Sequence, residues 1–218
     1  MSINFRKYEK VQTIILSAGF SSRMGEDKAL LDYDDIPIIV NLIRKIENLS
    51  EKVFIVLGEN FLQVKSVIEQ YDYDSKIEFI KNQNVKNGMF SSVKVAFDSI
   101  TDELPIMLQL IDHPFVGNTV YEKLIEAFDP NYLIFKPYMH YRNKKRAGHP
   151  ILFSPEFVDI IRKESIDSNL KELINRFQDK ICYVEVEDQA ILHNLNNKKD
   201  YIKALKIEKM FKLKDERM

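Results

Sequence analysis

Cysteine and long apolar runs are the features this sequence has least of. Cys182 is the only cysteine among 218 residues, which excludes an internal disulfide and any cysteine-rich zinc site. The letters around it, KICYVEV, are typical of a buried strand, so we interpret Cys182 as a small core residue. No apolar run approaches the roughly 20 residues that a transmembrane helix needs, and we expect no membrane partner.

An excess of charge of one sign is also missing. The chain carries 32 Lys and Arg residues against 33 Asp and Glu residues. Proteins that bind nucleic acids use surplus positive charge to neutralise phosphates, so we expect no nucleic-acid partner and favour a small molecule. The first residues, MSINFRKYEK, have mixed charge and no apolar core, so they do not resemble a signal peptide. The expected location is therefore cytoplasmic.

No linker, internal repeat or low-complexity segment interrupts the sequence. A domain typically holds about 100 to 200 residues, so a chain of this length has room for one full hydrophobic core. We expect a single domain over residues 1–218, with its core at about 11–205 and a charged C-terminal helix at 199–214.

Short apolar runs alternate with longer stretches of helical periodicity. The predicted strands are VQTIILSAG, KVFIVLG, KIEFIKN, PIMLQLIDHP, NYLIFKPY, HPILFS, ICYVEVE and AILHNL. The predicted helices are Ile38–Leu49, Phe61–Tyr71, Gly88–Ile100, Val120–Phe128, Pro155–Lys163, Asn169–Phe177 and Lys199–Lys214. We interpret MHYRNKKRAG as a polar, basic loop between two strands. The alternation predicts an α/β fold, Rossmann-like, with three layers α/β/α and a mostly parallel sheet.

Three polar motifs follow predicted strands. They are the loop after Leu16, the loop before Gly88 and the DHP that follows Ile111. In an open sheet of this class, ligands bind beyond the carboxyl ends of the strands. We therefore expect the three motifs to meet at one site.

The loop after Leu16 has the composition of a phosphate cradle. Glycines let backbone N–H groups approach an anion closely, and Gly19 and Gly25 flank Ser21 and Ser22 here. The Walker phosphate loop is excluded because Gly25 is followed by Glu and Asp instead of Lys-Ser or Lys-Thr. The dinucleotide fingerprint is excluded because GFSSRMG supplies two glycines where three are needed.

This loop resembles the signature of nucleotidyltransferases, written roughly L-A-A/G-G-x-S-x-R-M-G-x-x-K. The matching residues are Leu16, Ala18, Gly19, Ser21, Arg23, Met24, Gly25 and Lys28. The resemblance implies a fold of the nucleotide-diphospho-sugar transferase type and a loop that wraps a triphosphate. It also implies that Arg23 and Lys28 neutralise phosphate charge during catalysis. The implied nucleotide-binding residues of this loop are Leu16, Ser17, Ala18, Gly19, Ser21, Ser22 and Gly25.

Asp112 follows the apolar strand IMLQLI and precedes His113 and Pro114. A lone carboxylate at a strand end suits Mg²⁺, which takes oxygen ligands and shares the phosphates of the substrate. An aspartate that merely caps a turn is the alternative. In the resembling family a D-x-P at this place supplies a metal-binding aspartate, so Asp112 is a candidate catalytic and metal residue. We assign His113 no catalytic function.

The stretch NGMFSSVKVA resembles the family's G-m-x-x-S-l segment through Gly88, Met89 and Ser92. A helix N-terminus offers free N–H groups, and the resemblance implies contact with the base and sugar of the nucleotide. Gly88 and Ser92 are therefore candidate nucleotide-binding residues. The alternative is that Ser91 or Ser92 is a plain N-cap.

The segment GHPILF resembles a motif of the molybdenum cofactor cytidylyltransferases in the MobA-like branch. The resemblance places Gly148, His149 and Pro150 near the acceptor substrate; a structural histidine ahead of a strand is the alternative. The preceding loop carries four cations that either attract a phosphorylated acceptor or are simply solvated: Arg142, Lys144, Lys145 and Arg146.

The segment NLNNKKDY stands where these cytidylyltransferases have D-I-D-T-P-x-D. Asn194 and Asn196 thus replace aspartates, and Lys198 replaces proline. An Asn carbonyl is a neutral ligand for Mg²⁺, so Asn196 is a second candidate metal residue, with weaker affinity than an aspartate.

Together these motifs predict a Mg²⁺-dependent nucleotidyltransferase. CTP is the favoured nucleoside triphosphate and molybdopterin the favoured phosphorylated acceptor, with a molybdenum enzyme or a maturation protein as a further partner. One alternative is a transferase for a sugar phosphate or another phosphorylated alcohol. Another is a non-catalytic nucleotide-binding protein in cofactor maturation.

Overall fold

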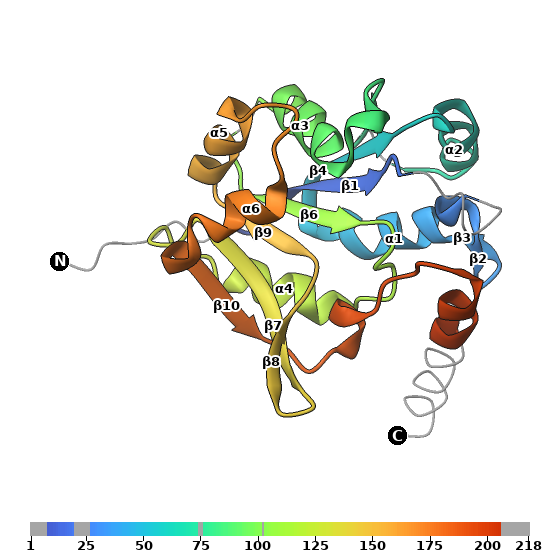
Figure 1. Cartoon of the computed structure of the whole chain (residues 1–218). Coiled ribbons are helices and arrows are strands. Elements are labelled where there is room, and N and C mark those ends of the chain that lie inside the picture. Colours follow the sequence, from blue (N-terminus) through green and yellow to red (C-terminus); the bar gives the residue numbers. More distant parts are fainter. Residues whose placement is uncertain (1–7, 20–26, 74–75, 102, 206–218) are drawn as a thin grey trace.

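The computed structural model describes residues 8–19, 27–73, 76–101 and 103–205 (Figure 1). The strands are β1 Val11–Ser17, β2 Asp32–Tyr33, β3 Ile36–Pro37, β4 Ser50–Leu57, β5 Ile77–Lys81, β6 Ile106–Leu110, β7 Ile134–Tyr141, β8 Lys144–Ala147, β9 Ile151–Phe153 and β10 Ile181–Glu185. The α-helices are α1 Ile38–Ile46, α2 Phe61–Ile68, α3 Met89–Ser99, α4 Asn118–Glu126, α5 Pro155–Lys163 and α6 Leu170–Asn175. Short 3₁₀ turns cover Lys28–Leu30, Glu47–Leu49, Val85–Asn87, Gln178–Lys180 and Gln189–Leu192.

One eight-stranded sheet forms the middle layer of the fold. Its order is β10-β7-β9-β6-β1-β4-β5. Strand β8 is the eighth strand; it lies outside this order and pairs with β7. Strands β4, β1 and β6 are parallel neighbours, as are β5 with β4 and β10 with β7. Strands β9 and β8 run in the opposite direction. The predicted α/β architecture with a mostly parallel sheet is confirmed.

Helices cover both faces of the sheet, and the alternation of side chains along β1 explains why. Ile14 and Leu16 belong to the core on the face of α3, α5 and α6. Ile15, on the other side of the strand, belongs to the core beneath α1, α2 and α4. All residues of β1 are buried because both faces are covered, which is the pattern of a central strand in such a fold (Figure 1).

The direction of β9 decides what reaches the functional edge of the sheet. Strand β9 is antiparallel to both β6 and β7, with Ile151 opposite Leu108 and Leu152 opposite Phe135. The amino end of β9 therefore lies at the edge where the parallel strands have their carboxyl ends. As a result, the GHP segment just before β9 joins the same edge as the loop after β1 and the turn after β6.

Two of the sequence-based element predictions are wrong. The stretch AILHNL is not a strand: Gln189–Leu192 is a 3₁₀ turn, because Asp188 caps it by accepting a hydrogen bond from the Ala190 N–H at 2.8 Å. The stretch MHYRNKKRAG is not a loop but the tip of a β7–β8 hairpin. Arg142 and Asn143 form its two-residue turn with φ of 50° and 59°, a geometry that matches the twist of hairpin strands.

The ends of several elements also differ from expectation. Helix α2 ends at Ile68, short of Tyr71, and the described part of the C-terminal segment is helical over residues 198–205. Cys182 lies in strand β10 as predicted, but it is half-buried instead of fully enclosed. Within the described residues, no helix is both long and apolar enough to cross a membrane.

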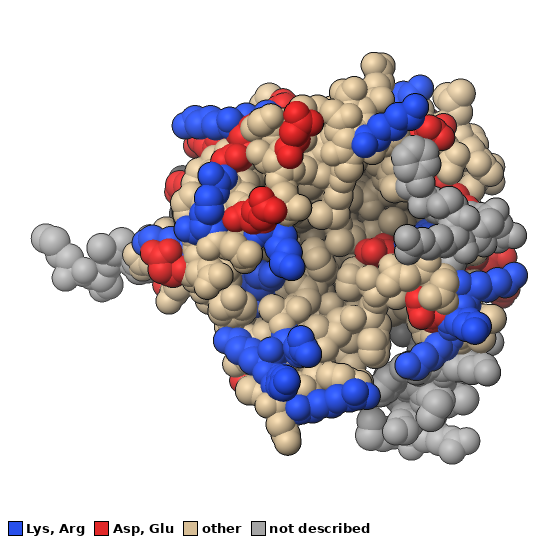
Figure 2. Space-filling view, viewed as in Figure 1, with Lys and Arg blue, Asp and Glu red and all other residues tan. Residues whose placement is uncertain are grey.

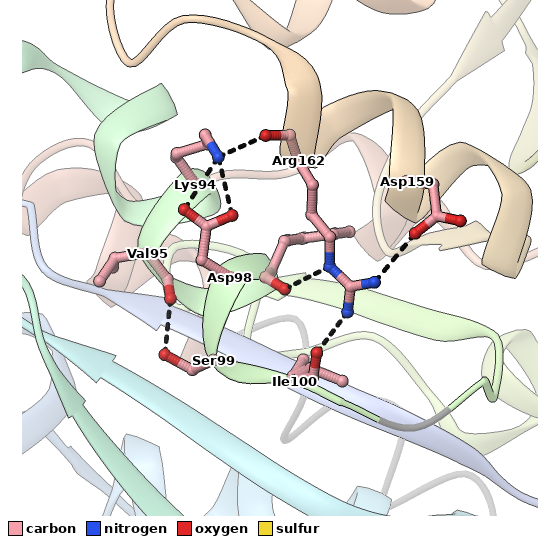
Figure 3. Close-up of polar contacts among 8 residues, drawn as sticks. Lys94, Val95, Asp98, Ser99, Ile100, Asp159 and Arg162 are labelled. Atoms are coloured by element: carbon pink, nitrogen blue, oxygen red, sulfur yellow. Dashed lines mark hydrogen bonds and ion pairs between the residues drawn. The ribbon is translucent and has the colours of Figure 1, made fainter.

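Arg162 at the end of α5 fixes the end of α3 (Figure 3). Its Nε donates to the Phe97 carbonyl at 2.9 Å, and its Nη2 donates to the Ile100 carbonyl. In return, Lys94 on α3 donates to the Arg162 carbonyl at 2.6 Å. Cations at helix C-termini satisfy the orphan carbonyls there, so each helix caps the other.

Candidate active site

The three motifs predicted to meet do meet in one pocket. The pocket has a volume of about 340 Å³ and opens at the carboxyl ends of β1 and β6 and the N-terminus of α3. Its predicted lining residues are Leu16, Ser17, Ala18, Gly19, Lys28, Gly88, Ser92 and Asp112. Ser21, Ser22, Arg23 and Gly25 lie outside the described residues. The pocket thus joins segments that lie far apart in the chain.

The loop after β1 approaches its neighbour very closely. A Cβ on Gly58, at the end of β4, would lie 2.7 Å from the Ala18 carbonyl oxygen and 3.0 Å from a Val85 methyl carbon. Only glycine fits there, so Gly58 allows the loop and the segment before α3 to pack side by side. Lys28 follows Asp27, whose carboxylate caps a 3₁₀ turn by accepting from the Ala29 N–H at 2.9 Å.

Asn82 organises the segment that leads into α3. Its Nδ2 donates to the hydroxyl oxygens of Ser91 and Ser92, each at 2.9 Å, and its Oδ1 accepts from the Asn84 N–H at 2.7 Å. Gly88, with φ of 84°, is the N-cap of α3 and makes no side-chain cap bond. Neither serine is therefore an N-cap. Ser92 instead lines the pocket with its oxygen held from behind by Asn82.

Gln109 holds the turn that carries Asp112. The Gln109 side chain is fully buried, and its Nε2 donates to the carbonyls of Leu110 and His113 at 2.7 and 2.9 Å. Its Oε1 accepts from the Tyr121 hydroxyl at 2.9 Å. Burial raises the pKa of Tyr121, which keeps the phenol protonated and able to donate. The turn is thus anchored to α4 behind the sheet.

The carboxylate of Asp112 is partly enclosed and incompletely bonded. Among the described residues its Oδ1 is buried and has no hydrogen-bond partner, and His113 Nε2 lies 3.8 Å away. Burial lowers the pKa of His113, although the negative charge of Asp112 opposes this. Because the imidazole of His113 is then neutral, it does not compensate the charge of Asp112. The unbonded Oδ1 of Asp112 is therefore available for a cation.

No cluster of three or more His, Cys, Asp or Glu residues able to hold a metal occurs in the described ranges. A metal held by Asp112 would therefore take most of its ligands from elsewhere. Mg²⁺ commonly binds through one or two carboxylates, with substrate phosphates and water completing its coordination. The unused oxygen of Asp112 fits that chemistry.

The GHP segment lies beside this turn. The imidazole rings of His149 and His113 have centroids 5.1 Å apart. Burial lowers the pKa of His149 to about 3, and His113 and Lys136 add to the effect. Gly148 has a packing role as well, because a Cβ there would lie 2.0 Å from the Ile191 carbonyl oxygen. Pro150 follows directly and is buried.

The NLNN segment is tied to the same turn. The Leu195 N–H donates to the Asp112 carbonyl at 2.8 Å, which brings both flanking asparagines close to the turn. Asn196 is exposed, and its Nδ2 donates to Asn194 Oδ1 at 2.9 Å. Asn197 and Asp200 then start the helix at 198–205 with reciprocal bonds of 3.1 and 3.2 Å, a capping box. Asn196 lines a separate hollow of about 200 Å³.

Comparison with known proteins agrees with this geometry. Residues 13–181 match the MobA-like NTP transferase domain. The chain belongs to this family. Over 195 residues, covering 89% of the chain and 95% of the relative, it is 25% identical to the molybdenum cofactor cytidylyltransferase of Escherichia coli K12.

Two further similar proteins come from other organisms. The chain is 23% identical over 202 residues to a probable molybdenum cofactor guanylyltransferase of Bacillus mycoides, covering 90% of the chain and 96% of the relative. A solved nucleotidyl transferase from Methanothermobacter thermautotroptrophicus has a TM-score of 0.73 at 16% identity, covering 91% of this chain and 97% of that one. This last match bears on the fold alone.

The sequence-based predictions missed three residues of this MobA-like transferase that lie near the site. Asn82 and Gln109 support the pocket from behind, and Lys136 lies near His149. Asn82 did offer a signal, because it is the first residue after β5, at the same edge as the motifs that were recognised. Gln109 and Lys136 lie inside strands, where a polar residue is commonly an outward-facing one.

Proposed function

We propose that this MobA-like nucleotidyltransferase transfers a nucleoside monophosphate from CTP to molybdopterin and releases pyrophosphate. The observation that carries the proposal is the single pocket in which Lys28 and Asp112 join the loop after β1 and the N-terminus of α3. A cation, backbone N–H groups and a carboxylate around one pocket are the groups needed to bind a triphosphate and its metal.

In the proposed reaction an oxygen of the acceptor phosphate attacks the α-phosphorus of CTP. The new P–O bond forms as the bond between the α-phosphorus and the bridging oxygen to the β-phosphorus breaks, and the electron pair leaves with pyrophosphate. The protein supplies position and charge instead of a covalent nucleophile. Lys28 stabilises negative charge that grows on the phosphates. Arg23 has the same proposed role.

Asp112 is the proposed ligand for Mg²⁺, because its buried Oδ1 has no hydrogen-bond partner among the described residues. When bound, the metal supplies charge neutralisation on the triphosphate. Asn196 is the proposed second ligand through its amide oxygen. Its exposure and its neutral charge predict a weaker contribution than that of Asp112.

The choice of CTP and molybdopterin rests on the GHP segment and on the cytidylyltransferase relative, which matches 95% of its own length. The guanylyltransferase relative supports GTP as the second candidate. A phosphorylated alcohol other than molybdopterin is the alternative acceptor, since the loop after β1 and Asp112 would serve it equally.

Thermal unfolding of the purified protein with CTP, GTP, ATP and UTP, each with and without Mg²⁺, tests the nucleotide. A ligand that binds only the folded state raises the melting temperature, by an amount that grows with its concentration over Kd. We expect a Mg²⁺-dependent rise with CTP that exceeds the rise with the other three.

The control is Asp112→Asn, which keeps the size of the side chain and removes its charge. It should abolish the dependence on Mg²⁺ while leaving the melting temperature of the free protein nearly unchanged. A larger rise with GTP would replace CTP in the proposal. No rise with any nucleotide would contradict nucleotide binding itself. Nucleotide binding without release of pyrophosphate from the nucleotide, whichever acceptor is added, would identify a non-catalytic protein.

A further inference from the structure

Lys136 is a half-buried cation in the middle of strand β7. It alternates with Ile134, which belongs to the core under α3, α5 and α6, so both side chains leave the strand on that face. Across the described ranges, its ammonium group has no hydrogen-bond or ion-pair partner. Burial and the nearby Lys171 of α6 both lower the pKa of Lys136. A half-buried ammonium near a second cation reduces stability unless an anion joins it.

Lys136 is fixed next to the GHP segment by the backbone. The Gly148 N–H donates to the carbonyl of Pro137, the residue after Lys136, at 2.9 Å. His149 follows, and its own N–H donates to the Ile191 carbonyl at 3.1 Å. These two bonds hold His149 beside β7. The positive charge of Lys136 contributes to the lowered pKa of His149.

His149 connects this pair to the nucleotide pocket. Its Nδ1 is buried and unbonded among the described residues, and its ring packs 5.1 Å from that of His113. His113 in turn lies 3.8 Å from Asp112, which lines the nucleotide pocket. Lys136, His149 and Asp112 therefore lie along one path that leads from β7 to the place where the nucleotide is proposed to bind.

We propose that Lys136 and His149 form an anion subsite that holds the phosphate of the acceptor next to the nucleotide pocket. This inference rests on the proposed nucleotidyltransferase function. Lys136 supplies positive charge and N–H donors, and the neutral imidazole of His149 supplies one further N–H donor. A phosphate bound between them gives the half-buried ammonium its missing counterion and directs a phosphate oxygen toward the α-phosphorus.

The exposed cations of the β7–β8 hairpin have a different role. Figure 2 shows Lys and Arg side chains gathered over this hairpin, away from the hollow at the centre of the face. Lys145 Nζ lies 4.1 Å from the ring centroids of both Tyr138 and Tyr183, and Arg142 stacks over Tyr141 at 5.2 Å. Exposed cations raise the local concentration of an anionic acceptor without fixing its position.

Steady-state kinetics with molybdopterin as the varied substrate test the subsite. Lys136→Met keeps the length of the side chain and removes its charge, and Lys144→Met removes one charge from the exposed hairpin. We expect Lys136→Met to raise the KM for molybdopterin by about tenfold or more, because it removes a charge-assisted contact. Lys144→Met should change that KM by less than about threefold, as expected for exposed charges.

Two readouts separate this result from a structural defect. Lys136→Met should melt at the same temperature as the wild type or higher, because it removes a half-buried charge that has no partner. Its Mg²⁺-dependent stabilisation by CTP should also be unchanged. An unaltered KM for molybdopterin in Lys136→Met would overturn the inference while leaving the proposed transferase function intact.

Histidine NMR with inorganic phosphate tests the subsite without any turnover. The chain has four histidines, and His149→Gln identifies the signal of His149. Phosphate should shift that signal in the wild type and in Lys144→Met but not in Lys136→Met. Absence of the shift in the wild type would overturn the inference even in an active enzyme. Absence of turnover with any acceptor would contradict the proposed function alone, because the phosphate shift is measured independently.

Discussion

At the scale of single residues, the pocket depends on polar groups that buried side chains hold in position. The Ser92 oxygen accepts a hydrogen bond from Asn82, so the hydroxyl hydrogen of Ser92 is available to a ligand in the pocket. Gln109 fixes the turn of Asp112 in the same way, through the carbonyls on either side of it. These supporting residues determine which atoms face the nucleotide.

The substitution Asn82→Asp tests this orientation. An ionised carboxylate cannot donate, so the Ser92 hydroxyl would turn its hydrogen away from the pocket and toward the new carboxylate. The added negative charge would also repel the phosphates. We expect the affinity for CTP with Mg²⁺ to fall by about tenfold or more in a calorimetric titration, consistent with the loss of a buried hydrogen bond.

The matched variant is Ser92→Ala, which removes the hydroxyl itself and should weaken nucleotide binding in the same direction. Ser99→Ala, on the far end of α3, should leave it unchanged. Wild-type affinity in Asn82→Asp would show that the direction of the Ser92 hydroxyl has no influence on the nucleotide.

Some residues of the site were predictable from sequence motifs, and others were not. The loop after Leu16, the loop before Gly88 and the DHP after Ile111 were predicted to converge because each follows a strand whose direction the alternating pattern implies. Asn82 follows a predicted strand, but its bonds to Ser91 and Ser92 join residues 9 and 10 positions apart, and the bond of Gln109 to Tyr121 joins residues 12 positions apart. No local pattern predicts such bonds. Their roles depend on tertiary packing.

At the scale of elements, α3 is held at both ends by different means. Its N-terminus faces the pocket through Gly88 and Ser92, and its C-terminal carbonyls accept hydrogen bonds from Arg162 of α5. Asp159 orients the guanidinium from Nη1 at 2.9 Å, but it is largely exposed and the pair itself adds little stability. The carbonyl contacts are the stabilising part.

Arg162→Ala should lower the free energy of unfolding by about 2 kcal/mol, since hydrogen bonds to a charged group each contribute roughly 1.5–3 kcal/mol. Urea denaturation measures the change. Arg162→Lys, which keeps the charge but not the fork of donors, should lose an intermediate amount. If Asp159→Ala destabilised the protein as strongly as Arg162→Ala, the ion pair would be the main contribution.

Elements with a clear apolar period were predictable, and elements with a polar pattern were not. Helix α3 and strands β1, β4 and β6 lie where the sequence placed them. The β7–β8 hairpin was missed because β8 is exposed along its whole length, so no alternation between apolar and polar side chains marks it. The turn at Gln189–Leu192 was taken for a strand because its apolar residues bury against the core from a 3₁₀ conformation.

At the scale of the whole molecule, the site joins two parts of the sheet. Strands β1 and β4, with the segment that follows β5, lie on the side of the pocket lined by Lys28 and Ser92. Strands β9 and β7, with the segment after β10, lie on the side of His149. The sequence predicts that β9 is a strand but carries no indication of its direction. That direction, set by pairing with β6 and β7, is what brings His149 to the site.

Gly148 packs closely against the segment after β10. Gly148→Ala would place a Cβ 2.0 Å from the Ile191 carbonyl oxygen, so the segment after β10 must move. We expect a loss of about 1–3 kcal/mol in the free energy of unfolding, the usual cost of overpacking. Urea denaturation measures it, and a raised KM for the acceptor with unchanged CTP affinity should accompany it.

Gly19→Ala is the matched control for stability, because a Cβ at Gly19 meets no atom within 4 Å among the described residues. It should unfold at the same urea concentration as the wild type. Equal stability of the two variants would mean that the segment carrying Ile191 yields without cost.

The β7–β8 hairpin lies between the paired parts of β7 and β9, where Ile134 is opposite Phe153. Its length can therefore change without shifting the register of any strand, and closing a longer loop costs little entropy. Residues can therefore be inserted or deleted at Arg142 and Asn143 while β1, β4 and β6 keep their pairing.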